Sequence, residues 1–216
     1  MIKLVILDFD GTLSDTRELI VRTNQETQRR MHWSVCEPQR IIATIGLPLA
    51  EGIMTMCPDV RPEDLPQWIQ VYREVFDSLK KTIIPTLFPH VKETLQALHQ
   101  SGHTISVASS RGRQSLMDFL HGMGIAPYIA YVLGADDVTH AKPHPEPVLK
   151  TLAHLSVPAQ EAIVVGDMPV DIQMGRGALA WTCGVTYGNS SREALLEAGA
   201  NWVLDDFSDL LPLLSH

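Results

Sequence analysis

The sequence predicts an α/β protein: a doubly wound, Rossmann-like parallel sheet with an all-helical cap inserted into it. Two observations favour this class. Short apolar runs rich in β-forming residues recur without strict alternation, as in strands buried on both faces of a parallel sheet. Helical patterns separate these runs, which indicates helices layered on the sheet. The predicted strands span residues 3–7, 104–108, 129–133, 162–166 and 182–186.

The predicted helices between these strands each carry one apolar face. Residues 91–100, for example, place Val91, Leu95 and Leu98 on one face and end at the stop signal Ser101-Gly102. Strands and helices therefore alternate through this part of the chain. The same helical pattern recurs at residues 114–121 and 145–155.

One region interrupts this alternation. Residues 16–81 contain no convincing strand, and the last helical pattern in them carries Leu65, Ile69, Tyr72 and Phe76 at helical spacing. We expect this region to be a helical cap, residues 16–81, at the carboxyl edge of the sheet, where ligands of open α/β sheets bind. The core would then comprise residues 1–15 and 82–216. The helical patterns in the cap span residues 17–31, 49–56 and 62–80.

The composition excludes several classes of protein. With 45% hydrophobic and 19% charged residues, the 216-residue chain is ordinary for a globular protein and unlike a disordered or collagen-like one. A net charge of −8 without a basic run argues against nucleic acid or an anionic membrane as partner. The three cysteines form no CxxC pair, and Asp8 and Asp10 interrupt the N-terminal apolar run. We therefore expect a reduced, cytoplasmic protein without a signal peptide or a membrane span.

The first chemically informative motif is Asp8-Phe9-Asp10-Gly11-Thr12, directly after the first predicted strand. Two carboxylates this close raise each other's pKa unless a cation lies between them. Mg²⁺, a hard ion that prefers oxygen ligands, would neutralise them. Gly11 permits a tight turn whose amides could face an anion, although Asp-Gly pairs are also common in solvated turns.

Further polar side chains follow two other predicted strands or lie in a stiffened loop. Ser109 and Ser110 follow the second strand, Asp167 and Asp171 follow the fourth, and Lys142 lies in a proline-rich segment before a helix. Each has an ordinary structural explanation by itself, as a helix cap, a surface lysine or a turn residue. Combined with the first motif, they supply the carboxylates, hydroxyl and ammonium of a Mg²⁺-dependent phosphoryl-transfer site.

Taken in order, these motifs resemble those of the haloacid dehalogenase-like superfamily. The resemblance is to its phosphatases with a helical cap, in particular the phosphoglycolate phosphatase-like branch. It covers residues 8 to 171, most of the chain. The matching segments are residues 8–12, the strand ending at Ser109, Lys142-Pro143, and residues 166–171.

The resemblance implies a role for each acidic residue. Asp8 would be the nucleophile that forms an aspartyl-phosphate, and Asp10 would be the general acid and then the general base. The Asp8 side chain, the Asp10 backbone carbonyl and Asp167 would bind Mg²⁺. Asp171 would lie outside them, orienting Lys142 or metal-bound water. We expect no histidine pair with the spacing of metal ligands, and His144, between two prolines, is interpreted as a loop residue.

The resemblance also implies how the phosphoryl group is held. Ser109 and Lys142 would bind its oxygens, with Lys142 offsetting the developing charge. Thr12 would pack at the start of the flap that leads to the cap. Amides near Asp10, including that of Gly11, would contact the phosphate.

The cap should supply contacts to the rest of the substrate. Residues 44–49 resemble the loop that phosphoglycolate phosphatase-like proteins direct at the leaving group, although the same segment also fits a plain helix-loop-helix corner. The expected hinges of the cap are residues 14–16 and 81–85. Arg17 and Arg22 are further candidate anion contacts, although an arginine of this kind is more often a solvated surface residue. The predicted substrate contacts are Gly11, Thr16, Gly46, Leu47, Ser110 and Arg111.

We therefore expect a Mg²⁺-dependent phosphatase, monomeric or homodimeric, for a small phosphorylated metabolite similar to phosphoglycolate. An inorganic pyrophosphatase and a sugar-phosphate mutase use the same four motifs and stay open, although the uncharged tip at residues 46–49 disfavours a mutase. A phosphoacceptor signalling domain uses similar groups around Mg²⁺. It is disfavoured because Asp8 lies on the first strand and a helical insertion follows it.

Overall fold

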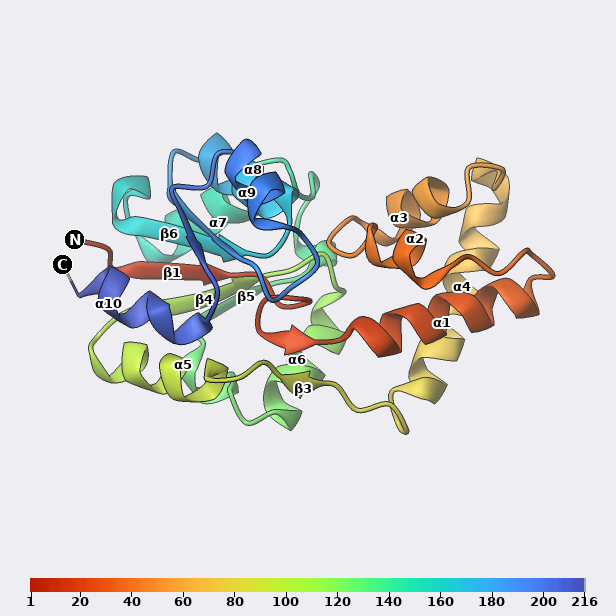
Figure 1. Cartoon of the computed structure of the whole chain (residues 1–216), viewed down its shortest axis with the longest axis horizontal. Coiled ribbons are helices and arrows are strands. Elements are labelled where there is room, and N and C mark those ends of the chain that lie inside the picture. The colour runs from red at the N-terminus through yellow and green to blue at the C-terminus, as the bar shows by residue number, and fades with distance from the viewer. Residues whose placement is uncertain (216) are drawn as a thin grey trace.

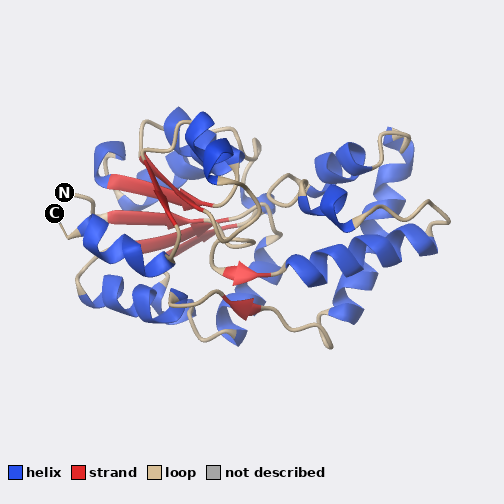
Figure 2. Ribbon diagram, in the orientation of Figure 1, coloured by secondary structure: helices blue, strands red, loops and turns tan. Residues whose placement is uncertain are grey.

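The computed structural model describes residues 1–215, and it confirms the predicted fold class (Figures 1 and 2). Within these residues, six strands form one sheet in the order β5-β4-β1-β6-β7-β8, and every neighbouring pair is parallel. The strand order reverses at the central β1, which β4 and β6 flank. The strands are β1 (Leu4–Leu7), β4 (Thr104–Ala108), β5 (Tyr131–Leu133), β6 (Ala162–Gly166), β7 (Trp181–Val185) and β8 (Trp202–Leu204).

Helices cover both faces of this sheet. They are α5 (Val91–Gln100), α6 (Arg113–Gly122), α7 (Glu146–Leu155), α8 (Pro169–Gly177), α9 (Arg192–Glu197) and α10 (Leu210–Leu214). Successive side chains of a strand point to opposite faces, and all four residues of β1 are apolar and buried. Val5 and Leu7 pack with α5, α6 and α10, whereas Leu4 and Ile6 pack with α7 and α8. The unalternating apolar pattern of β1 thus follows from its having helices on both sides.

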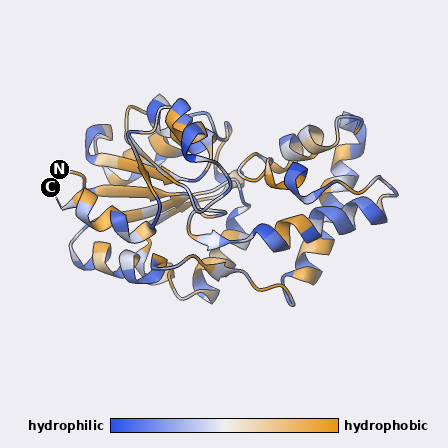
Figure 3. Cartoon of the chain, in the orientation of Figure 1, coloured by the Kyte–Doolittle hydropathy of each residue, from blue (hydrophilic) through white to orange (hydrophobic). Residues whose placement is uncertain are grey.

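Residues 17–79 form a separate group of helices, on the right of Figure 1. Its members are α1 (Arg17–Arg30), α2 (Pro38–Ile42), α3 (Leu49–Met56) and α4 (Leu65–Leu79). Their apolar faces meet around Ile41, Ile53 and Trp68, which are fully buried. Blue polar stretches alternate with orange apolar ones along these helices, as expected of an amphipathic bundle (Figure 3).

A short ribbon joins the helical group to the sheet. β2 (Ser14–Asp15) pairs antiparallel with β3 (Thr86–Leu87), where the chain enters and leaves the helices (Figure 2). The expected hinges at residues 14–16 and 81–85 include or adjoin this ribbon. The division into a core of residues 1–15 and 82–216 and a cap of residues 16–81 stays our proposal, with the ribbon as the connection.

Differences from the predicted elements have local causes. The helix predicted at 62–80 begins as a 3₁₀ turn, Pro62–Asp64, and α4 starts at Leu65 because Pro66 is tolerated in a first turn but not in a helix interior. β5 begins late, at Tyr131, because Ala126–Tyr128 form a 3₁₀ turn. Seven elements were not predicted: α2, α8, α9, α10, β2, β3 and β8. Among residues 1–215, no helix is long and apolar enough to cross a membrane. The other 3₁₀ turns are Ala135–Asp137, Ala159–Glu161 and Phe207–Asp209.

Candidate active site

Three parallel strands end at one edge of the sheet, and each is followed by a side chain predicted for the site. Asp8 follows β1, Ser109 follows β4 and Asp167 follows β6. The Asp8 amide donates to the Val165 carbonyl at 2.9 Å, and the Ser109 amide donates to the Leu133 carbonyl at 3.0 Å. The hydrogen bonds of the sheet thus continue to Asp8 and Ser109 and fix their backbones. All three side chains are buried.

Lys142 lies buried between two carboxylates. Its Nζ donates to Asp8 Oδ1 at 2.5 Å and to Asp171 Oδ1 at 2.6 Å. Burial disfavours the ammonium, but Asp171 and Asp8 outweigh burial and raise the pKa of Lys142. Burial also raises the pKa of Asp8 well above its usual value; Lys142 opposes this effect, and Asp171 and Asp167 add to it. The lysine therefore stays charged and fixes the Asp8 carboxylate.

Asp167 is held by residues from two loops. Thr12 Oγ1 donates to its Oδ1 at 3.1 Å, and the backbone amide and side-chain amide of Asn189 donate to Oδ2 at 2.7 and 2.8 Å. Burial and the neighbouring Asp171 raise the pKa of Asp167 to about 7, although the hydrogen bonds from Asn189 and Thr12 act in the opposite direction. The hydrogen bonds thus orient the Asp167 carboxylate, but they do not offset the effect of burial and of Asp171 on its pKa.

The carboxylates fit a divalent cation. Asp8, Asp167 and Asp171 each offer an oxygen, and these atoms lie within 4.8 Å of one another. Three buried carboxylates face the single charge of Lys142, so burial and mutual repulsion raise the pKa of Asp8 and Asp167. Oxygen donors of this kind suit Mg²⁺. Of the predicted ligands, Asp8 and Asp167 belong to this cluster, whereas the side chain of Asp10 lies against other partners.

Asp10 is held by Arg111 and Thr16. Arg111 donates from Nε to Oδ2 at 3.1 Å and from Nη2 to Oδ1 at 2.5 Å, and Thr16 Oγ1 donates to Oδ1 at 2.7 Å. The guanidinium also lies over the ring of Phe76, 5.1 Å from its centroid, and over that of Phe119, at 4.9 Å. Arg111 and Thr16, both predicted as substrate contacts, therefore bind the predicted acid–base residue.

Gly11 has a packing role that the sequence did not predict. Its amide donates to the Ser14 carbonyl at 3.0 Å, so that amide is not free to bind a phosphate. Its φ is +96°, and a Cβ here would lie 2.3 Å from Asp167 Oδ2. Only glycine therefore allows the turn after β1 to approach Asp167 so closely.

The loop after β7 was missed by the sequence analysis. Besides Asn189, it contains Gly188, whose carbonyl accepts a bond from Arg17 Nη2 at 2.9 Å, and Arg17 Nε donates to Asn189 Oδ1 at 3.1 Å. Tyr187 Oη donates to the Thr12 carbonyl at 2.9 Å. Arg17, a candidate anion contact, thus binds the loop whose Asn189 holds Asp167. The available signal was a polar turn after a parallel strand, at the edge where the other site residues lie.

The loop between α2 and α3 faces the site. Thr44, Ile45, Gly46 and Leu47 line a cavity of about 690 Å³ together with Asp8, Asp10, Ser109, Ser110 and Arg111. Ser110 Oγ donates to the Gly46 carbonyl at 2.6 Å. The loop is therefore both a helix-loop-helix corner and a wall of the site. Arg22 is exposed and does not line this cavity.

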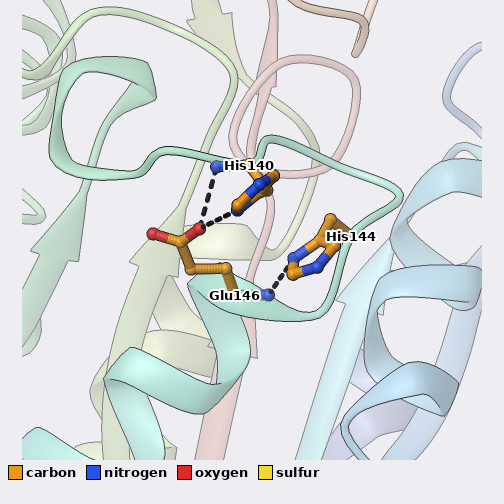
Figure 4. Close-up of side chains that lie close together, drawn as sticks. All are labelled: His140, His144 and Glu146. Carbon is orange, nitrogen blue, oxygen red and sulfur yellow. Dashed lines mark hydrogen bonds and ion pairs between the residues drawn. The ribbon is translucent and has the colours of Figure 1, made fainter.

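A second cluster, shown in Figure 4, lies in the loop around Lys142. His140 and His144 are four residues apart and meet Glu146, so the expectation that no histidine pair has metal-binding spacing is wrong. His140 Nδ1 lies 2.9 Å from Glu146 Oε2, and the Glu146 amide donates to His144 Nδ1 at 3.1 Å. A bond from the Thr139 amide contributes most to lowering the pKa of Glu146 to about 2. These bonds order the loop, and the cluster does not line the cavity.

Comparison with known proteins agrees with this geometry. Residues 5–185 match the family model described as haloacid dehalogenase-like hydrolase. A phosphoglycolate phosphatase from Salmonella typhimurium is 31% identical, over 99% of this chain and 92% of its own. A pyrophosphatase from Bacillus pumilus is 32% identical, over 99% and 96%. A structure described as a haloacid dehalogenase-like hydrolase from Bacteroides fragilis superposes with a TM-score of 0.92 at 25% identity, over 97% of this chain and all of the other.

The chain therefore belongs to the haloacid dehalogenase-like hydrolase family. This confirms the resemblance stated from the four motifs. It also confirms the prediction of an enzyme, a phosphoric monoester hydrolase of this family.

Proposed function

We propose that the protein is a Mg²⁺-dependent phosphatase that hydrolyses a small phosphorylated metabolite through an aspartyl-phosphate on Asp8. The arrangement of Asp8, Lys142 and Asp171 carries this proposal. It presents one carboxylate to the cavity with an ammonium 2.5 Å from its Oδ1, where phosphoryl oxygens would gather during attack.

The side chains divide the reaction between them. An Asp8 carboxylate oxygen attacks phosphorus, and the bond from phosphorus to the leaving oxygen breaks. Asp10, in its protonated form, gives its proton to the leaving oxygen and then removes a proton from the water that releases phosphate. Ser109 and Lys142 bind the phosphoryl oxygens in both steps. Mg²⁺, held by Asp8, Asp167 and the Asp10 carbonyl with Asp171 beside them, would neutralise charge on the transferring group.

The relatives supply the first substrates to test. Phosphoglycolate and pyrophosphate are named for similar proteins. Phosphate release should therefore be measured on phosphoglycolate, pyrophosphate, sugar phosphates and simple alkyl phosphates, with Mg²⁺ and with a chelator. Mg²⁺-dependent release from at least one phosphomonoester supports the proposal. Release that survives saturating chelator, or none from any ester, would contradict it.

A further inference from the structure

The cavity above Asp8 is large, and several of its lining residues are apolar. Its volume of about 690 Å³ lies within the range of about 300–1,000 Å³ that holds drug-sized ligands. The helical group contributes Ile20, Ile53, Met56 and Phe76 to the lining. A two-carbon leaving group would leave most of this space filled with water against apolar side chains, an unfavourable arrangement.

The cations of the cavity are poorly placed to bind an anionic leaving group. Among the described residues that line it, Arg111 is paired with Asp10, and Lys80 lies 2.6 Å from Asp77. Arg73 is exposed. Recognition of a carboxylate such as that of glycolate would therefore have to break an existing ion pair or use an exposed side chain.

One residue that lines the same cavity carries a buried polar atom without a hydrogen-bond partner. Asn24 in α1 is 3% exposed and lies among the lining residues. Its Nδ2 donates to the Ile20 carbonyl at 3.0 Å, whereas its Oδ1 is buried without a hydrogen-bond partner. A buried acceptor without a partner is unfavourable, and a donor on a bound molecule would satisfy it.

From these three observations we propose that the leaving group is an uncharged, mainly apolar alcohol with a second hydroxyl at its far end. This proposal rests on the proposed phosphatase function. The phosphate lies at Asp8, the apolar body contacts Ile53 and Met56, and the terminal group donates to Asn24 Oδ1. The cavity thus selects an amphipathic phosphomonoester over phosphoglycolate.

A series of ω-hydroxyalkyl phosphates of about three to eight carbons tests this proposal. Each is compared, by kcat/KM for phosphate release with Mg²⁺, with the n-alkyl phosphate of equal length and with phosphoglycolate. We expect one intermediate length to exceed phosphoglycolate and to exceed its n-alkyl counterpart by about tenfold, the value of one hydrogen bond. Asn24→Leu should remove the preference for the hydroxyl. Gln25→Leu, the neighbouring amide on α1 outside the cavity, should keep it.

Each outcome decides one point. The highest kcat/KM on phosphoglycolate, or equal values for hydroxyalkyl and alkyl esters at every length, would overturn the proposal while the phosphatase function stands. A hydroxyl preference that survives in Asn24→Leu would also overturn it. No phosphate release from any ester would instead contradict the phosphatase function itself. If Asn24→Leu does not fold, Gly52→Leu provides a second test, because a side chain at this lining position should lower kcat/KM for the longest esters most.

Discussion

Ser110 Oγ donates a 2.6 Å hydrogen bond to the Gly46 carbonyl and so connects the residue after Ser109, the proposed phosphate contact, to the loop of the helical group. The two residues are 64 positions apart in sequence, and both line the cavity. Removal of this bond should therefore affect substrate binding more than folding.

Ser110→Ala should raise KM for all esters and lower stability by only about 1 kcal/mol, the usual net value of one hydrogen bond. The measurements are kcat and KM on two esters together with the thermal midpoint. Ser101→Ala, which removes an exposed hydroxyl bonded to the Leu98 carbonyl, is the matched control. Unchanged KM in a folded Ser110→Ala protein would show that the contact does not position the loop.

Asp8→Asn should reduce turnover by about a thousandfold or more, because an amide cannot attack phosphorus. The fold should persist, since Lys142 keeps its 2.6 Å contact with Asp171. Phosphate release and circular dichroism test both points. Substantial turnover by a folded mutant, with deamidation and contaminating phosphatase excluded, would disprove the assignment of the nucleophile.

Asn189→Ala should weaken Mg²⁺ activation by about 10- to 100-fold, as expected for a residue that orients a proposed metal ligand. Asn189 supplies both hydrogen bonds to Asp167 Oδ2, and the mutation removes the side-chain one. The measurement is the Mg²⁺ concentration for half-maximal rate. Ser190→Ala removes the neighbouring hydroxyl, which contacts Met168 instead, and should leave this concentration unchanged.

The metal-free protein should show a pH dependence that Asp167 explains. The pKa of Asp167 is about 7 in the folded chain and 3.8 as its ordinary value. Between these values the folded state retains a proton that the unfolded state has released, so the Asp167 contribution to stability falls as pH rises. In chelator, the thermal midpoint of Asp167→Asn relative to that of the wild type should therefore rise as the pH increases from about 4 to about 8. Bound Mg²⁺ should reverse the fall in wild-type stability with rising pH. A difference between the two thermal midpoints that does not change with pH would contradict the prediction.

Leu47→Lys should shift selectivity toward anionic leaving groups. Leu47 lines the cavity, so the substitution adds a positive charge there without adding a negative one. The ratio of kcat/KM for phosphoglycolate to that for an alkyl phosphate should rise by about tenfold. Unchanged ratios in a folded mutant would show that this loop does not contact the leaving group.

The groups at the ends of β1, β4 and β6 were predictable because apolar runs identify buried strands, and parallel strands end at one edge. The partner of Asp10 was not, because Arg111 lies 101 residues away and reaches it only through the packing of Phe76 and Phe119. Asn189 was missed because a polar turn carries no periodic signal. β8 is three half-buried residues at the sheet edge, too short to show a pattern.

The β2–β3 ribbon separates the helices that line the cavity from the strand ends that carry the proposed catalytic residues. The chain enters and leaves the helical group through Ser14–Asp15 and Thr86–Leu87, which are paired. The apolar lining residues from the helical group therefore all lie between these two neighbouring strands; they are Ile20, Ile53, Met56 and Phe76. Asp8, Ser109, Lys142 and Asp167 all lie outside this segment. A chimaera in which the segment between β2 and β3 is replaced by that of a relative should therefore acquire the substrate preference of the relative. The proposed catalytic residues at the edge of the sheet would remain unchanged.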